Sequence, residues 1–176
     1  MLPQPSTLLF LVVNIHASHY FSAGYAKLTL GRRWHSWLLE NPLQLLPANA
    51  YAWGWAQFIP WEQWRTLIRL VERLRFPSLL ACLLIELLAP LALLGPHAAL
   101  SGILSWCGFH LMVFLMSGLL FWDWVVANAL LLLALFFLPA TEQQALFGVE
   151  QTLLSWIFIL VFPMRNRLWG PIMLAW

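Results

Sequence analysis

The chain has 176 residues, of which 62% are hydrophobic and only 9% are charged. Soluble domains are typically about 45–50% apolar and about 25% charged, so a soluble fold would have too little polar surface to cover these residues. The formal net charge is only +2, and the two cysteines lie in apolar runs without metal-binding or redox spacing. The composition therefore predicts an all-α integral membrane protein, a polytopic bundle of transmembrane helices that forms one domain over residues 1–176.

The first predicted membrane span covers residues 6–30, and it is interrupted by the polar residues Asn14, His16, His19 and Lys27. The segment 31–77 follows, which is rich in arginine and tryptophan. Within this segment, apolar and charged residues alternate at helical spacing over residues 61–75. That pattern predicts an amphipathic helix that lies in the membrane interface with its apolar face toward the lipid.

Four further apolar stretches have about the length needed to cross the hydrocarbon core. They are residues 78–94, 98–117, 120–139 and 144–163. A single helix over residues 98–139 would be about 60 Å long, twice the thickness of the core, so we expect a break at Ser117–Asp123. Five spans place every arginine on one side of the membrane, which the positive-inside rule assigns to the cytoplasm. We therefore expect a bacterial inner-membrane protein with its N-terminus outside and its C-terminus in the cytoplasm.

Charged groups at bilayer depth are costly, and they normally face other helices or a cavity. Lys27 either extends toward the headgroups or serves as a buried base, while Glu86 and His110 either bond neighbouring helices or belong to a functional site. His16 or His19 opposite His110 could also ligate haem or chlorophyll, whereas Asp123 is expected in a water-facing turn. The sequence predicts no metal site, and arginines spread along a tryptophan-rich membrane-surface helix argue against nucleic-acid binding.

The stretch YFSAGYAKL at residues 20–28, followed by Trp34, resembles a motif of the HTTM family, the membrane domain of vitamin K-dependent gamma-carboxylase and many bacterial proteins. IELLAPL at 85–91 and GFHLMVFLMSGLLF at 108–121 resemble later pieces of the family in the same order, so the likeness covers about residues 8–140. It implies that Lys27 matches the base that deprotonates vitamin K hydroquinone, and that His110 matches the histidine of the later helix. The family's earlier spans and its large soluble domain have no counterpart in this sequence, so we expect a truncated relative.

Three functions remain open from the sequence. The first is an HTTM-like, non-catalytic accessory or assembly subunit, whose partners are the lipid bilayer and other subunits of a membrane complex. The second is a membrane enzyme that acts on a quinone or lipid-like substrate, with Lys27 as general base and Glu86 and His110 as its partners. The third is a subunit that holds haem or chlorophyll through His16, His19 and His110.

Overall fold

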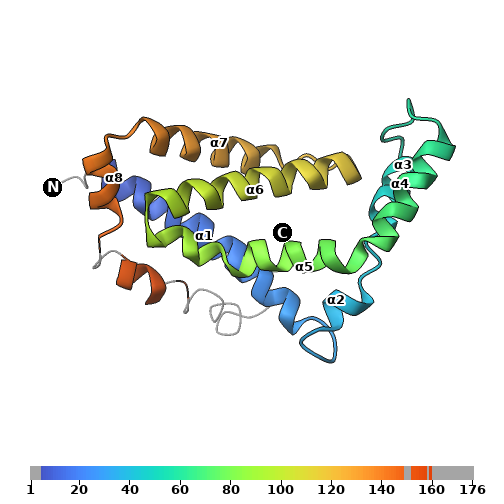
Figure 1. Ribbon diagram of the computed structural model, residues 1–176, viewed down its shortest axis with the longest axis horizontal. Helices are drawn as coiled ribbons and strands as arrows, with labels where there is room; N and C mark the ends of the chain where they lie inside the picture. The colour runs from blue at the N-terminus through green and yellow to red at the C-terminus, as the bar shows by residue number, and fades with distance from the viewer. Residues whose placement is uncertain (1–4, 149–151, 158, 160–176) are drawn as a thin grey trace.

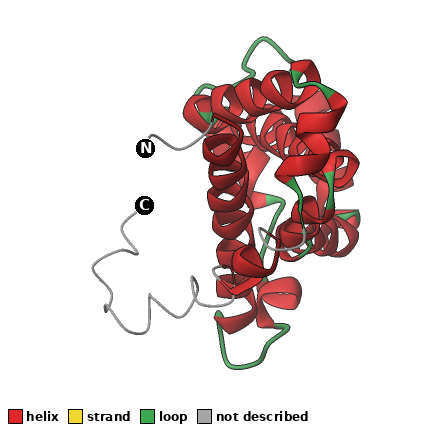
Figure 2. Ribbon diagram, turned by 90° about the vertical axis from the view of Figure 1, so that its left-hand side faces the viewer, coloured by secondary structure: helices red, strands yellow, loops and turns green. Residues whose placement is uncertain are grey.

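The computed structural model describes residues 5–148, 152–157 and 159, and over these residues the chain is made of helices and loops without a strand (Figure 2). The all-α prediction is therefore confirmed. The elements in chain order are α1 Pro5–Thr29, α2 Ser36–Glu40, α3 Leu45–Ala52, α4 Trp61–Arg73, α5 Arg75–Leu87, the 3₁₀ helix η1 Ala89–Leu94, α6 Pro96–Ser117, α7 Trp122–Phe137 and α8 Ala140–Leu146.

The longer helices form a bundle, and the short helices lie at its two ends (Figure 1). Helix α1 packs against α5 and η1, and α6 packs against η1 and α7. The end of α1, helices α2–α4 and the turn between α6 and α7 all lie at one end, while α8 lies at the other (Figure 1). The main core joins α1, η1, α6 and α7 through residues such as Val13, Leu93, Ile103 and Leu135.

Helix α1 runs from Pro5 to Thr29, so its bounds agree closely with residues 6–30 of the predicted first span, although whether it crosses a membrane stays a prediction. Its buried side carries small residues that let other helices approach, notably Ala17 and Gly24. A Cβ atom added to Gly24 would lie 2.9 Å from the Cβ of Glu86 and 3.1 Å from the backbone nitrogen of Leu87. The glycine therefore sets how closely α1 and α5 can approach each other.

The predicted span 78–94 is not one continuous helix. Helix α5 begins at Arg75 and ends at Leu87, and the chain continues as the 3₁₀ helix η1 from Ala89. Pro90 explains the change, because proline has no N–H to donate and its ring clashes with the carbonyl four residues earlier. The preceding amphipathic helix has its charged residues exposed, as predicted, and it ends at Arg73 rather than at residue 75. Its apolar face was predicted to face the lipid, but Trp64 and Val71 of that face are buried within the protein, and the Trp64 indole donates a hydrogen bond to the carbonyl oxygen of Pro47.

The expected break between the third and fourth apolar stretches is confirmed, since α6 ends at Ser117 and α7 begins at Trp122. Gly118 caps α6 in the left-handed conformation, with a φ of 70°, and a Cβ atom here would lie 2.6 Å from the ring of Trp55. Both the backbone conformation and the space require glycine.

Length and composition single out α6 as the one helix within the described part of the chain that could cross a membrane. Helix α7 is apolar but shorter. The predicted last span, 144–163, lies partly outside the described residues, and its described part consists of the end of α8 and a helical stretch over residues 152–157. The five-span arrangement therefore stays a prediction.

Candidate functional site

Lys27 and Glu86 form an ion pair between α1 and α5. The Lys27 Nζ lies 2.5 Å from each carboxylate oxygen of Glu86, and the two side chains are 20% and 4% exposed. The same ammonium group lies 5.3 Å from the centre of the Trp37 ring, which is a cation–π distance. Lys27 is therefore held by a carboxylate and an aromatic ring.

The local sequence explains how a carboxylate reaches Lys27. Gly24 lies about one turn before Lys27 on α1, and its missing side chain leaves room for the backbone of α5 at Glu86 and Leu87. Glu86 lies in the last turn of α5, immediately before the break at Leu88. The glycine, the lysine and the end of α5 thus position the pair together.

Tyr20 is the centre of a second polar contact, two turns before Lys27 on the same helix. Its hydroxyl oxygen lies 2.7 Å from Nε2 of His110 on α6, and the side-chain amide of Asn128 on α7 donates a hydrogen bond of 3.0 Å to it. The Tyr20 ring is stacked on Trp106, with ring centres 4.5 Å apart. This contact ties three helices together at one buried hydroxyl.

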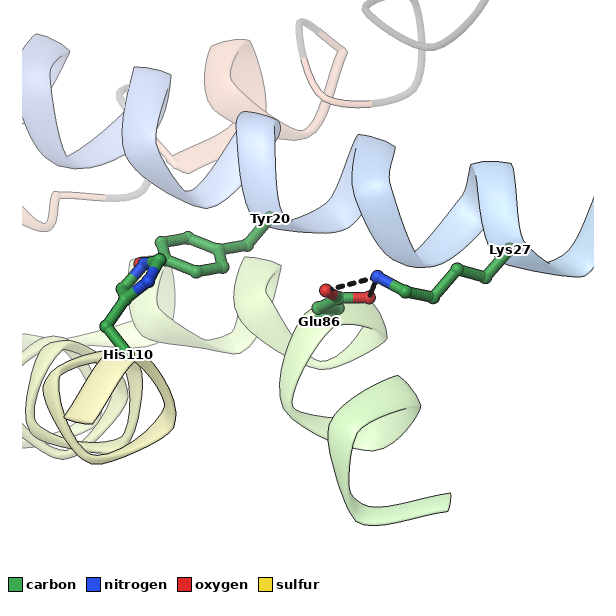
Figure 3. Close-up of polar contacts among 4 residues, drawn as sticks. All are labelled: Tyr20, Lys27, Glu86 and His110. Carbon is green, nitrogen blue, oxygen red and sulfur yellow. Dashed lines mark hydrogen bonds and ion pairs between the residues drawn. The ribbon is translucent and has the colours of Figure 1, made fainter. Parts of the chain in front are cut away.

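Figure 3 shows how the three predicted catalytic residues lie. Lys27 is directed at Glu86, whereas His110 contacts Tyr20. The structure thus brings two of the three together and gives His110 a different partner. Tyr20 lies about 10 Å from Lys27 along the helix axis, as expected for seven residues of α helix.

Two polar atoms of the Tyr20 contact have no hydrogen-bond partner among the described residues. They are Nδ1 of His110 and Oδ1 of Asn128, and both are buried. A buried unpaired group costs about 1–3 kcal/mol, so these atoms could bond a small polar group.

The three predicted cofactor ligands surround one indole ring. The rings of His16, His19 and His110 lie 5.4, 5.6 and 6.2 Å from the ring of Trp124, measured between centroids. Nδ1 of His16 is 3.2 Å from the carbonyl oxygen of Val12, one turn earlier on its own helix. Because Nε2 of His110 faces the Tyr20 hydroxyl, this nitrogen could ligate a haem iron or a chlorophyll magnesium only after leaving that contact. The assignment of haem or chlorophyll to these histidines remains a prediction.

Sequence reasoning did not single out Tyr20 or Trp37, although both contact the predicted residues. Tyr20 is the first residue of the YFSAGYAKL stretch. It lies seven residues before Lys27, and this spacing indicates that both residues share one face of a helix. Asn14 forms a further contact in the N-terminal half of α1, where its side-chain amide donates a 3.0 Å hydrogen bond to Ser155. Asp123 is exposed in the first turn of α7, as expected for a water-facing turn.

A cavity of about 550 Å³ lies between α5 and α6, and residues of α2, α3 and α4 also line it. Its walls are almost entirely apolar, and they include Trp37 and Cys82. None of Lys27, Glu86 and His110 is among the residues that line it. This cavity therefore lies beside the Lys27–Glu86 ion pair, but neither residue of the pair lines it.

Comparison with protein families, with curated proteins and with solved structures found no match for this chain. The structure therefore assigns the chain to a general class and to no family. It is an all-helical protein whose long first helix is bonded to its neighbours through buried polar side chains.

Proposed function

We propose that the chain is an HTTM-like integral membrane protein that acts as a non-catalytic accessory or assembly subunit of a larger membrane complex. The observation that carries this proposal is the Lys27–Glu86 pair. A lysine whose Nζ meets both oxygens of one carboxylate is a charged hydrogen-bond donor, whereas a general base requires a neutral amine with a free lone pair. The predicted base is thus engaged in holding two helices together.

Location in a membrane is supported by the outer surface of the bundle. Large apolar side chains are exposed along α6 and α7, among them Leu104, Leu111, Leu130, Phe136 and Phe137. Apolar surface of this extent is unfavourable in water and is typical of contact with lipid or with another protein. These faces would lie against acyl chains or against neighbouring subunits.

The proposed orientation is supported by the arginine-rich end. The arginines of the described chain lie between Arg32 and Arg75, in the segment that includes α2–α4 at one end of the bundle. Exposed aromatic residues lie in the same segment, including Trp34, Trp53 and Phe58. Tryptophan is enriched at both membrane interfaces, whereas arginine is enriched on the cytoplasmic side, so the arginines lead us to assign this end to the cytoplasmic side.

The test is purification from the native membrane in mild detergent after an alkaline wash. We expect the protein to stay with the membrane and to co-migrate with other membrane proteins in fixed stoichiometry, identified by mass spectrometry. A lone protein that carries a bound quinone would contradict the accessory role, and release by the alkaline wash would contradict membrane integration. An absorption spectrum of the same sample tests the haem or chlorophyll alternative through its Soret or Qy band.

A second candidate function is a membrane enzyme acting on a quinone or lipid-like substrate. The observation that favours it is the pair of unpaired buried atoms, His110 Nδ1 and Asn128 Oδ1, which could bond the polar head of such a molecule. This function predicts that His110→Ala abolishes turnover in a protein that remains folded.

A further inference from the structure

The cavity between α5 and α6 is open on the side facing the surroundings of the bundle. Wall residues of both helices are exposed there, namely Ser78 and Ala81 of α5 and Ser105, Gly108 and Met112 of α6. If the bundle is embedded in a membrane, an opening between two such helices faces acyl chains rather than water. The cavity volume of about 550 Å³ is typical of sites that hold a small molecule, about 300–1,000 Å³.

A hydrogen-bonding amide lines the cavity near helices α2–α4, and a cation that is not itself a wall residue lies close by on α5. Asn41 lines the cavity beside Trp37, next to helices α2–α4. Arg75 is the first residue of α5 and lies about one turn before the wall residues Ser78 and Leu79 on the same face of that helix. Arg75 is half-buried, and none of the ion pairs found among the described residues includes it.

We propose that this cavity binds one acyl chain of an anionic phospholipid from the arginine-rich side of the membrane, with the lipid phosphate held by Arg75 and Asn41. A guanidinium group forms paired hydrogen bonds with phosphate oxygens, and neighbouring arginines add attraction for an anionic headgroup. The apolar walls then accept the chain, while the phosphate remains at the interface. This inference rests on the proposed membrane location but not on the accessory role.

Gly108 provides a direct way to fill the cavity. It lines the wall, and a Cβ atom added to it would meet nothing within 4 Å. A larger side chain at this position therefore enters the cavity without displacing another residue, and alanine in place of glycine favours the helix. Gly108→Leu is the blocking variant, and Gly108→Ala is its matched control.

The experiment is native mass spectrometry of the full chain in mixed micelles that contain phosphatidylglycerol and phosphatidylethanolamine in equal amounts. We expect wild type and Gly108→Ala to retain one phosphatidylglycerol. The fraction of Gly108→Leu that retains this lipid should be lower by a factor of about ten or more, since the leucine side chain occupies the site. Arg75→Gln should reduce the preference for phosphatidylglycerol about fivefold, the effect of one arginine near an anionic surface. Arg65→Gln should change it much less, because the charge of Arg65 is already paired with Glu62.

Thiol labelling gives a second measurement that does not depend on how Gly108→Leu folds. Cys82 lines the cavity, so in a Cys107→Ser background a maleimide probe should label Cys82 more slowly with phosphatidylglycerol than without it. Equal labelling rates, equal lipid retention by Gly108→Leu, or retention of a neutral lipid or quinone irrespective of Arg75 would overturn the inference. Release of the protein by an alkaline wash would instead overturn the membrane location itself, so the two failures are distinguishable.

Discussion

Two ion pairs in this chain have the same N–O distance, 2.5 Å, in very different surroundings. Glu62 and Arg65 belong to one turn of α4, and their side chains are 69% and 50% exposed. Lys27 and Glu86 are 59 residues apart, join α1 to α5, and are 20% and 4% exposed. An exposed pair contributes little to stability because water solvates both partners when they separate, whereas a buried pair leaves one unpaired charge when either partner is lost. The N–O distance alone therefore does not indicate which of the two ion pairs stabilises the fold.

The largest effect is expected for Lys27→Ala. The change leaves the Glu86 carboxylate buried without a cation, and breaking a buried pair in this way costs about 3–5 kcal/mol. A denaturant titration in mixed micelles measures the loss in free energy of unfolding, with Lys27→Arg as the control that keeps the charge. A loss below about 1 kcal/mol, the range of exposed pairs, would remove the contrast between the two pairs.

Gly24→Ala should have the next largest effect, because its new methyl group would lie 2.9 Å from the Cβ of Glu86. Overpacking of this kind costs about 1–3 kcal/mol. Gly108→Ala is the matched control on α6, since open space surrounds that position, and it should be neutral or stabilising by up to about 1 kcal/mol. Equal effects of the two substitutions would contradict the close approach of α1 and α5.

Tyr20→Phe tests the second polar contact of α1. It removes the hydroxyl that bonds His110 and Asn128 but keeps the ring stacked on Trp106. Hydrogen bonds between membrane helices contribute about 0.6 kcal/mol on average and up to about 1.7, so we expect a loss in this range in the same titration. An unchanged free energy of unfolding would show that the contact does not hold the helices together.

The smallest effect is expected for Arg65→Ala. Pairs three residues apart on an exposed helix face contribute below about 0.5 kcal/mol, so the free energy of unfolding should be unchanged within error. A loss as large as that of Lys27→Ala would mean that burial does not account for the difference between the two pairs.

The sequence predicted the helices whose ends are marked by local chemistry. Gly118 predicted the end of α6, and the alternation of charged and apolar residues predicted α4. The 3₁₀ helix η1 was missed, because whether proline kinks a helix or ends it depends on the packing around it.

Partners within the site were harder to predict than its residues. Lys27, Glu86 and His110 stand out from the sequence as ionisable residues in apolar stretches, and Lys27–Glu86 was one of the pairings it allowed. Only the packing of α1 against α5, α6 and α7 assigns Glu86 to Lys27 and Tyr20 to His110, because these contacts join residues 59 and 90 positions apart. The cavity between α5 and α6 has no sequence signal, since it depends on how two apolar helices diverge.

We propose that Lys27 and Glu86 hold helices together and carry out no chemistry. The most direct test replaces both at once, as Lys27→Met with Glu86→Leu, because two apolar side chains of similar size leave no unpaired charge. We expect this double variant to fold, to co-purify with the same partners as wild type, and to restore function in a strain that lacks the native protein. A double variant that folds and assembles at the wild-type level but fails to restore function would contradict the claim and identify the pair as catalytic.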